Sequence, residues 1–191
     1  VWSLQELQEI AATARELGLR VHLDGARLMN AVVANGSTAA QVGSLFDTVT
    51  LCLSKGLGAP LGALIAGSRE LMYRARVEKH RFGGALRQAG IVAAAGLYAL
   101  DHNVERLAHD HARARKLAEG WAAAGLPVDL ELVETNFVQV NVAALGLGEE
   151  EALERLRAAG VLLSVTKPGT LRALTHLDIT DDDVERALEL V

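Results

Sequence analysis

The sequence predicts an α/β fold for residues 1–110, followed by a small α+β unit in residues 111–191. Two observations predict the first part: helical segments separate short apolar strands, and polar residues stand directly at the ends of these strands. In the second part, shorter strands and helices alternate after residue 137. Half of the 191 residues are apolar, which is enough for a substantial core.

The first part opens with a helix and three strands. Ser3 and Glu6 form a capping-box pattern ahead of an apolar stripe, which Gly18 ends. Strands are predicted at residues 21–24, 48–53 and 63–66, with a short helix after the first. The first two strands should pair in parallel, because helical segments separate them. The third should pair antiparallel with the second, because the turn GLGAPLG is too short for a helical crossover.

The remaining elements follow from apolar spacing and from capping residues. Apolar residues at three- and four-residue spacing predict helices over residues 68–79, 87–100 and 103–124, and the domain boundary is placed near residue 110, inside the last of these. The small unit then contains a strand at 137–142, a helix at 149–159, strands at 161–165 and 170–175, and a final helix capped by Thr180.

Composition limits which kinds of partner and which cellular compartment are expected. The formal net charge is −5 and basic residues are interleaved with acidic ones, so neither nucleic acid nor a membrane surface is expected as a partner. No apolar run approaches the roughly 18 residues of a membrane span, and the first residues lack the layout of a signal peptide. Cys52 is the only cysteine and cannot form an internal disulfide, so a cytoplasmic setting is expected.

Lys55 closes the second strand in VTLCLSKGLGAPLG, directly before a glycine-rich turn. A surface lysine at a strand end is the ordinary explanation. Its neighbours, however, are small or apolar, so we expect a poorly solvated amine with a lowered pKa, able to form a Schiff base. The glycines at 56, 58 and 62 would let a bulky group approach the backbone. A P-loop is excluded, because there the glycines precede the lysine.

Asp24 stands at the end of the preceding strand, in HLDGAR. An Asx turn or a helix cap explains such an aspartate equally well. In a functional role, its carboxylate would pair with a protonated ring nitrogen. A lysine Schiff base and a carboxylate on a pyridinium nitrogen are the pair that a pyridoxal 5'-phosphate (PLP) site requires. Lys55 and Asp24 are therefore candidates for holding this cofactor.

Three arginines complete the candidate set. Arg27 lies one helical turn after Asp24, so both side chains can lean toward one side of a site. Arg87 follows a glycine pair and opens a predicted helix, a location suited to phosphate. Arg172 lies among apolar residues in TLRALTH, where a guanidinium needs a carboxylate partner. A surface ion pair is the commoner explanation for each arginine taken singly.

Four segments together resemble the threonine aldolases, which are fold type I (aspartate-aminotransferase-like) PLP enzymes within the β-eliminating lyase group: VHLDGARLMNA, LCLSKGLGAPLG, FGGALRQAGIVAAAGLYAL and LRALTHLDIT. They occur in the family's order, so the resemblance covers essentially the whole chain. It implies that Lys55 binds PLP covalently, Asp24 contacts the pyridine nitrogen, and Arg87 contacts the phosphate. It further implies that Arg27 and Arg172 hold the substrate carboxylate.

The resemblance also implies an activity and an assembly. Residues 1–110 would be the C-terminal part of a PLP-binding large domain, and the reaction would be cleavage of L-threonine or L-allo-threonine to glycine and an aldehyde. Another reaction of the same cofactor (β-elimination, racemisation or transamination) and an inactive truncated fragment remain alternatives. A homodimer or homotetramer is implied, because fold type I sites are generally built from two subunits.

The sequence departs from the family at its front. Members are considerably longer, and their N-terminal part supplies the ring-stacking histidine, a phosphate loop and the usual candidate for the base. Of the six histidines present, only His176 follows a candidate strand closely, and His109 and His111 face different ways on one helix, so no metal site is expected. We therefore expect a fragment that keeps the covalent anchor and cannot complete a catalytic site alone.

Overall fold

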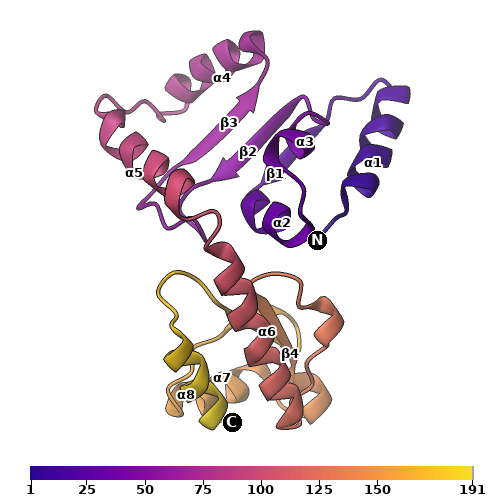
Figure 1. Cartoon of the computed structure of the whole chain (residues 1–191), viewed down its shortest axis with the longest axis vertical. Helices are drawn as coiled ribbons and strands as arrows, with labels where there is room; N and C mark the ends of the chain where they lie inside the picture. Colours follow the sequence, from indigo (N-terminus) through magenta and orange to yellow (C-terminus); the bar gives the residue numbers. More distant parts are fainter. Residues whose placement is uncertain (191) are drawn as a thin grey trace. The chain divides into compact units, whose positions relative to one another are not determined.

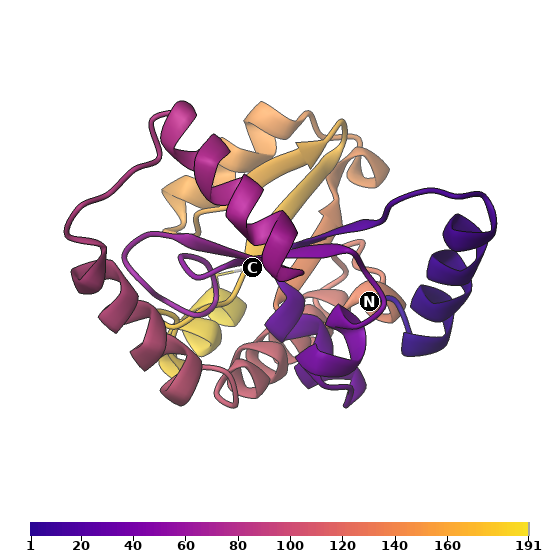
Figure 2. The same ribbon diagram turned by 90° about the horizontal axis from the view of Figure 1, so that it is seen from above.

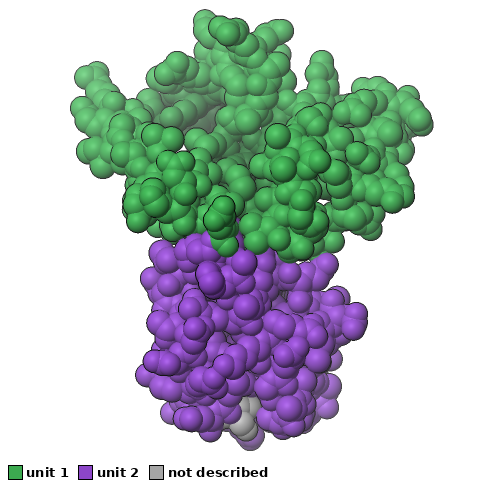
Figure 3. Space-filling view, in the orientation of Figure 1, with its two compact units in different colours: residues 1–105 green, residues 106–191 purple. Residues whose placement is uncertain are grey.

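The computed structural model describes residues 1–190, which form two compact units divided between Glu105 and Arg106. Figure 3 colours the two units separately. The predicted boundary near residue 110 lies close to this division, and as a domain boundary of the whole protein it stays a prediction. Within the described residues, no helix is both long and apolar enough to cross a membrane.

The first unit is built around a three-stranded sheet in the order β1-β2-β3. β1 runs parallel to β2, and β2 pairs antiparallel with β3, so both predicted pairings are confirmed. Figure 1 shows β2 in the centre, β1 toward the first three helices and β3 toward α4 and α5. The elements are α1 (Leu4–Glu16), β1 (His22–Gly25), α2 (Leu28–Asn35), α3 (Ala39–Gly43), β2 (Thr48–Cys52), β3 (Ala63–Gly67), α4 (Arg69–Arg81) and α5 (Ala89–His102).

The second unit packs helices against a second, antiparallel sheet in the order β4-β6-β5. Figure 2 shows the strands of this unit from above, in orange and yellow. The elements are α6 (Leu107–Ala123), the short 3₁₀ helix η1 (Leu130–Leu132), β4 (Phe137–Asn141), a second 3₁₀ helix η2 (Val142–Leu145), α7 (Glu149–Ala158), β5 (Ser164–Lys167), β6 (Thr170–Leu174) and α8 (Asp181–Glu189).

The core of the second unit forms because side chains along β4 and β6 point alternately to the two faces of the sheet. Val138 and Val140 of β4 and Leu171 and Ala173 of β6 point to the same face, where Trp121 of α6 packs against them. All of these side chains are buried. The period-two apolar pattern of the strands therefore produces one continuous core.

Several predicted elements differ from the structure, each for a local reason. The helix α3 was not predicted, because five residues are too few to show a periodic stripe. The long helix begins at Leu107 instead of 103, because α5 runs on to His102 and Asn103 ends it. The strand expected at 161–165 begins only at Ser164, because two of the three apolar residues before it, Val161 and Leu163, pack on the core of the second unit.

Candidate active site

Parallel pairing brings the ends of β1 and β2 to one edge of the first sheet. Asp24 is in register with Thr50, and the Lys55 turn follows three residues after β2 ends. Gly25 makes this close pairing possible, because a Cβ at that position would lie 2.3 Å from the carbonyl oxygen of Thr50. The two candidate residues therefore leave neighbouring strands at the same edge, which is where α/β sheets place ligands.

A tight turn holds Lys55. Its carbonyl accepts a hydrogen bond from the amide of Gly58 at 2.8 Å, and the amide of Ala59 donates to the carbonyl of Leu53 at 2.9 Å. Gly58 has a positive φ of 73°, which favours glycine over any residue with a side chain. The side chain of Asn103 at the end of α5 donates to the carbonyl of Leu57 at 2.8 Å. The turn is thus fixed from both strand and helix, and Gly58 is explained by its backbone geometry. The role of the glycines as room for a cofactor stays a prediction.

The expected poor solvation of Lys55 is wrong for this chain. Its side chain is exposed, while the apolar neighbours Leu53, Leu57 and Ala59 are buried. The turn directs the apolar side chains into the unit and Lys55 outward. Neighbours in sequence therefore do not desolvate this amine, and only groups from elsewhere could do so.

Cys52 is the last residue of β2, and sequence analysis did not include it among the candidate site residues. Its Sγ is 3.4 Å from the Oγ of Ser54. Desolvation acts to raise the pKa of the thiol, but the hydrogen bonds with Ser54 and the positive charges of Lys55 and Arg27 outweigh it, and the pKa is lowered. Both charges therefore act on one point at the end of β2. The sequence carries no local signal for this, because the charge of Arg27 is brought near Cys52 by the pairing of β1 with β2.

Asp24 forms the Asx turn that was considered as its alternative role. Its Oδ1 accepts from the amide of Ala26 at 3.1 Å, and the side chain is exposed. Because a carboxylate has two oxygens and about four acceptor positions, this turn orients Asp24 and still leaves acceptors for a ring N–H. The structural and the functional explanations of Asp24 are thus compatible.

Arg27 and Arg87 lie at the starts of helices in the first unit. Arg27 is half-buried at the N-cap position of α2 and makes no side-chain cap there. Arg87 is exposed and stands two residues before α5, which therefore begins slightly later than predicted. The assignments of Arg27 to the substrate carboxylate and of Arg87 to phosphate stay predictions.

Arg172 lies in β6 of the second unit, opposite Gln139 and Ser164. Its guanidinium carbon is 5.1 Å from the centre of the Phe137 ring, at cation–π distance. Its Nε is buried and has no hydrogen-bond partner among residues 1–190. A buried N–H donor without an acceptor is costly, so this arginine fits a site for an anionic ligand. Its role at the substrate carboxylate stays a prediction.

The histidine considered near the site is engaged locally. The Nδ1 of His176 accepts from the amide of Asp178 at 3.2 Å. His111 is half-buried, and desolvation lowers its pKa despite the nearby charge of Asp110. Among residues 1–190, no group of three histidine, cysteine or carboxylate side chains lies close enough together to hold a metal ion.

Comparison with protein families matches residues 1–145 to the β-eliminating lyases. The low-specificity L-threonine aldolase 1 of Arabidopsis thaliana is 36% identical over 188 residues, which covers 97% of this chain and 52% of that protein. The low specificity L-threonine aldolase of Escherichia coli strain K12 is 41% identical over 181 residues, covering 93% of this chain and 52% of that protein. The chain thus spans about half the length of these curated relatives.

Solved structures match over the full chain. A protein from Exiguobacterium, described as an aromatic amino acid β-eliminating lyase or threonine aldolase, superposes with a TM-score of 0.77 at 27% identity and covers 100% of this chain and 58% of the other. The threonine aldolase of Leishmania major superposes with a TM-score of 0.77 at 23% identity, covering 99% of this chain and 56% of the other. The second likeness concerns the fold alone.

Proposed function

Because this chain belongs to the β-eliminating lyase family, we propose that it is part of a PLP-dependent aldolase that cleaves L-threonine and L-allo-threonine to glycine and acetaldehyde. The reaction breaks the Cα–Cβ bond of a β-hydroxy-α-amino acid. Two observations support the proposal. Asp24 and Lys55 lie at the ends of two neighbouring parallel strands, and the curated relatives of the chain are named low-specificity L-threonine aldolases.

The residues present fit the cofactor. Lys55 would hold PLP covalently, Asp24 would accept from its ring nitrogen and Arg87 would bind its phosphate. When bound, PLP supplies an electron sink for the charge that develops at the substrate Cα. The exposure of Lys55 and the free acceptor positions of Asp24 support this assignment. We propose the cytoplasm as the compartment, which is supported by the single cysteine.

The arginines would decide which bond breaks. Arg27 and Arg172 would bind the substrate carboxylate, and a fixed carboxylate determines which Cα bond stands perpendicular to the cofactor ring. The buried, unpartnered Nε of Arg172 supports this role, because a carboxylate oxygen would satisfy it. The base that takes the β-hydroxyl proton is not assigned to any residue of this chain.

The test uses the full-length protein that contains these residues. We expect a visible absorption band that borohydride reduction traps, and loss of both band and aldolase activity in Lys55→Ala. Lys79→Ala, at an exposed position of α4, is the matched control and should keep both. A band that persists in Lys55→Ala would refute the assignment of Lys55.

β-Elimination is the second candidate, because the matched family is named for it. Incubation with L-threonine, L-allo-threonine and L-serine, assayed for acetaldehyde and for ammonia, separates the two reactions. Ammonia without acetaldehyde would overturn the aldolase proposal and favour elimination. The absence of any band in the full-length protein would favour an inactive chain over both.

We propose a homodimer or homotetramer as the assembly. Large apolar side chains of α4, of α5 and of the link between them are exposed, among them Tyr73, Ile91 and, in the link, Phe82. Such surfaces mark interaction sites in soluble proteins. Light scattering of the full-length protein at several concentrations measures the mass directly, and a monomer at all concentrations contradicts this assembly.

A further inference from the structure

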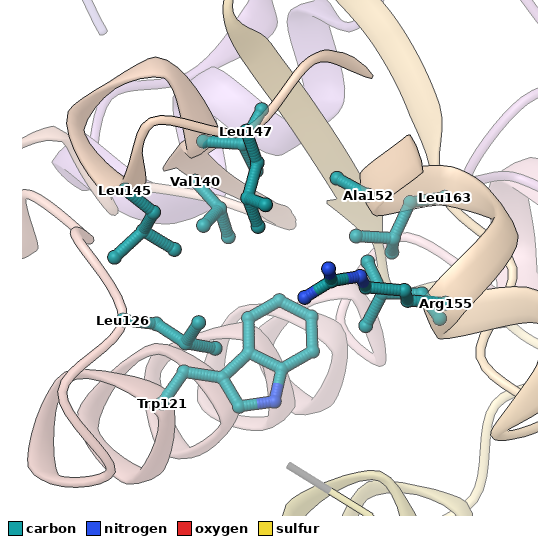
Figure 4. Close-up of a pocket in the computed structure, with 10 residues that line it drawn as sticks. Trp121, Leu126, Val140, Leu145, Leu147, Ala152, Arg155 and Leu163 are labelled. Carbon is teal, nitrogen blue, oxygen red and sulfur yellow. The ribbon is translucent and has the colours of Figure 1, made fainter. Parts of the chain in front are cut away.

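An apolar pocket lies within the second unit, and none of the residues assigned above to PLP or substrate lines it. Its volume is about 150 Å³. Figure 4 shows the indole of Trp121 as its floor, with Leu145 and Leu147 on one side and Ala152 and Leu163 on the other. These residues come from α6, η2, α7 and the connections around them.

The pocket suits an apolar group of limited size. Trp121 is 1% exposed, and Val140, Val142 and Ala152 are also buried, so solvent reaches the pocket only from its mouth. An apolar cavity of about this volume can hold a ring the size of benzene. The walls therefore favour a branched or aromatic hydrocarbon group of about six carbons.

Arg155 is the only charged residue among those that line the pocket. Figure 4 shows its guanidinium extending from α7 toward the centre of the pocket and the Trp121 ring. The side chain is 65% exposed, and one nitrogen donates to Glu151 at 2.5 Å. A guanidinium carries five N–H donors in a planar fork, so the contact with Glu151 leaves donors for a second acceptor.

From this arrangement we propose that the pocket binds a small carboxylate with an apolar tail, such as an arylacetic or branched-chain acid. The tail fills the space above Trp121, and the carboxylate receives hydrogen bonds from Arg155. The ion pair with Glu151 uses part of the guanidinium, and its remaining N–H donors are available to a carboxylate at the mouth of the pocket. The proposal does not rest on the aldolase activity.

The experiment is calorimetric titration of the full-length protein with phenylacetate, with benzyl alcohol as its neutral analogue. We expect saturable binding of phenylacetate, about tenfold weaker in Arg155→Met, because a charge-assisted hydrogen bond is lost. Arg157→Met is the matched control on the same helix, does not line the pocket, and should change the Kd less than about twofold. Benzyl alcohol should bind more weakly, with no dependence on Arg155.

Variants that fill the pocket show whether phenylacetate binds here or in the candidate active site, where arginines could also bind a carboxylate. Ala152→Leu should abolish the Arg155-dependent binding, and Leu145→Phe, at a half-exposed wall position, is a second filling variant if the first fails to fold. Binding that survives a folded filling variant, binding unaffected by Arg155→Met, or no saturable binding at all would each overturn the proposal.

Discussion

The two units differ in how much of their apolar surface they bury by themselves. In the second unit, the side chains of Trp121, Val138 and Leu171 are almost fully buried in one core. In the first unit, all five residues of β3 are exposed, and α4 has no buried residue. Of the candidate site residues, only Arg172 lies in the second unit, whose core is closed. The others lie in the first unit, called the open unit below.

The difference indicates that the first unit, which carries most of the candidate site residues, leaves apolar surface for other protein to cover. β3 is an edge strand with Leu64 and Ile65 exposed, and a long apolar edge is a liability unless another strand or segment covers it. The chain spans about half the length of its curated relatives. We infer that the open unit is covered in the full-length protein, which would also desolvate Lys55 from outside the turn.

Producing the two units as separate proteins tests this comparison, and we expect it to have the largest effect. Residues 106–191 alone should unfold cooperatively, because their core is built from their own residues. Residues 1–105 alone should show no cooperative transition, because their exposed apolar surface stays uncovered. Urea unfolding followed by circular dichroism measures both. A cooperative transition in residues 1–105 and none in 106–191 would reverse the comparison.

Truncating one aromatic side chain in each unit measures the same difference locally. Trp121→Ala removes a side chain that is 1% exposed and should lower the free energy of unfolding by about 3–5 kcal/mol. Tyr73→Ala removes one that is 72% exposed in the first unit, so in the full-length protein it should cost less than Trp121→Ala, because only the surface that covers α4 there contributes. Urea unfolding of the full-length variants provides both values, and a cost at Tyr73 as large as that at Trp121 would contradict the contrast in packing.

Sequence reasoning succeeded where local patterns decide the structure. The α/β class, the parallel pairing of β1 with β2 and the antiparallel return of β3 followed from strand spacing and link length. The Asx turn at Asp24 followed from residue type. These features depend on few residues close in the chain, so composition and spacing specify them.

Sequence reasoning failed where contacts between residues far apart in the chain determine the structure. The exposure of Lys55 depends on which side of the turn faces the core, and the start of β5 depends on packing of Val161 and Leu163. The charge of Arg27 near Cys52 depends on the pairing of two strands. No periodicity within one segment encodes such contacts, which is why the site set from the sequence lacked Cys52.

Close strand pairing at the candidate site makes Gly25 a sensitive position. Gly25→Ala would place a Cβ 2.3 Å from the Thr50 carbonyl, and pushing the strands apart should lower the free energy of unfolding by about 1–3 kcal/mol. Gly90→Ala is the control: it lies in α5 with nothing within 4 Å of an added Cβ, and it should stabilise by up to about 1 kcal/mol. Thermal unfolding of full-length variants compares them, and equal effects would show that β1 and β2 can separate without cost.

The smallest expected effect is a difference in pH dependence between two helix caps. The cap of α8 contains a carboxyl group that titrates, and the cap of α3 does not. At α8, the amide and hydroxyl of Thr180 and the Arg186 guanidinium lower the pKa of the Asp183 carboxyl. At α3, the matching residue is Gln41, whose amide has no charge to lose.

The sign follows from the lowered pKa. The contribution of Asp183 is present above the carboxyl's unfolded pKa and is lost as the pH falls through its lower folded value. Asp183→Asn should therefore destabilise residues 106–191 slightly near neutral pH and progressively less in acid. Urea midpoints of the unsubstituted unit and of this variant across the pH range measure the difference, while Gln41→Glu in the full-length protein should introduce a dependence of the same sign. A difference between the two midpoints that is constant with pH would mean that the cap holds through hydrogen-bond geometry alone, with no contribution from its charge.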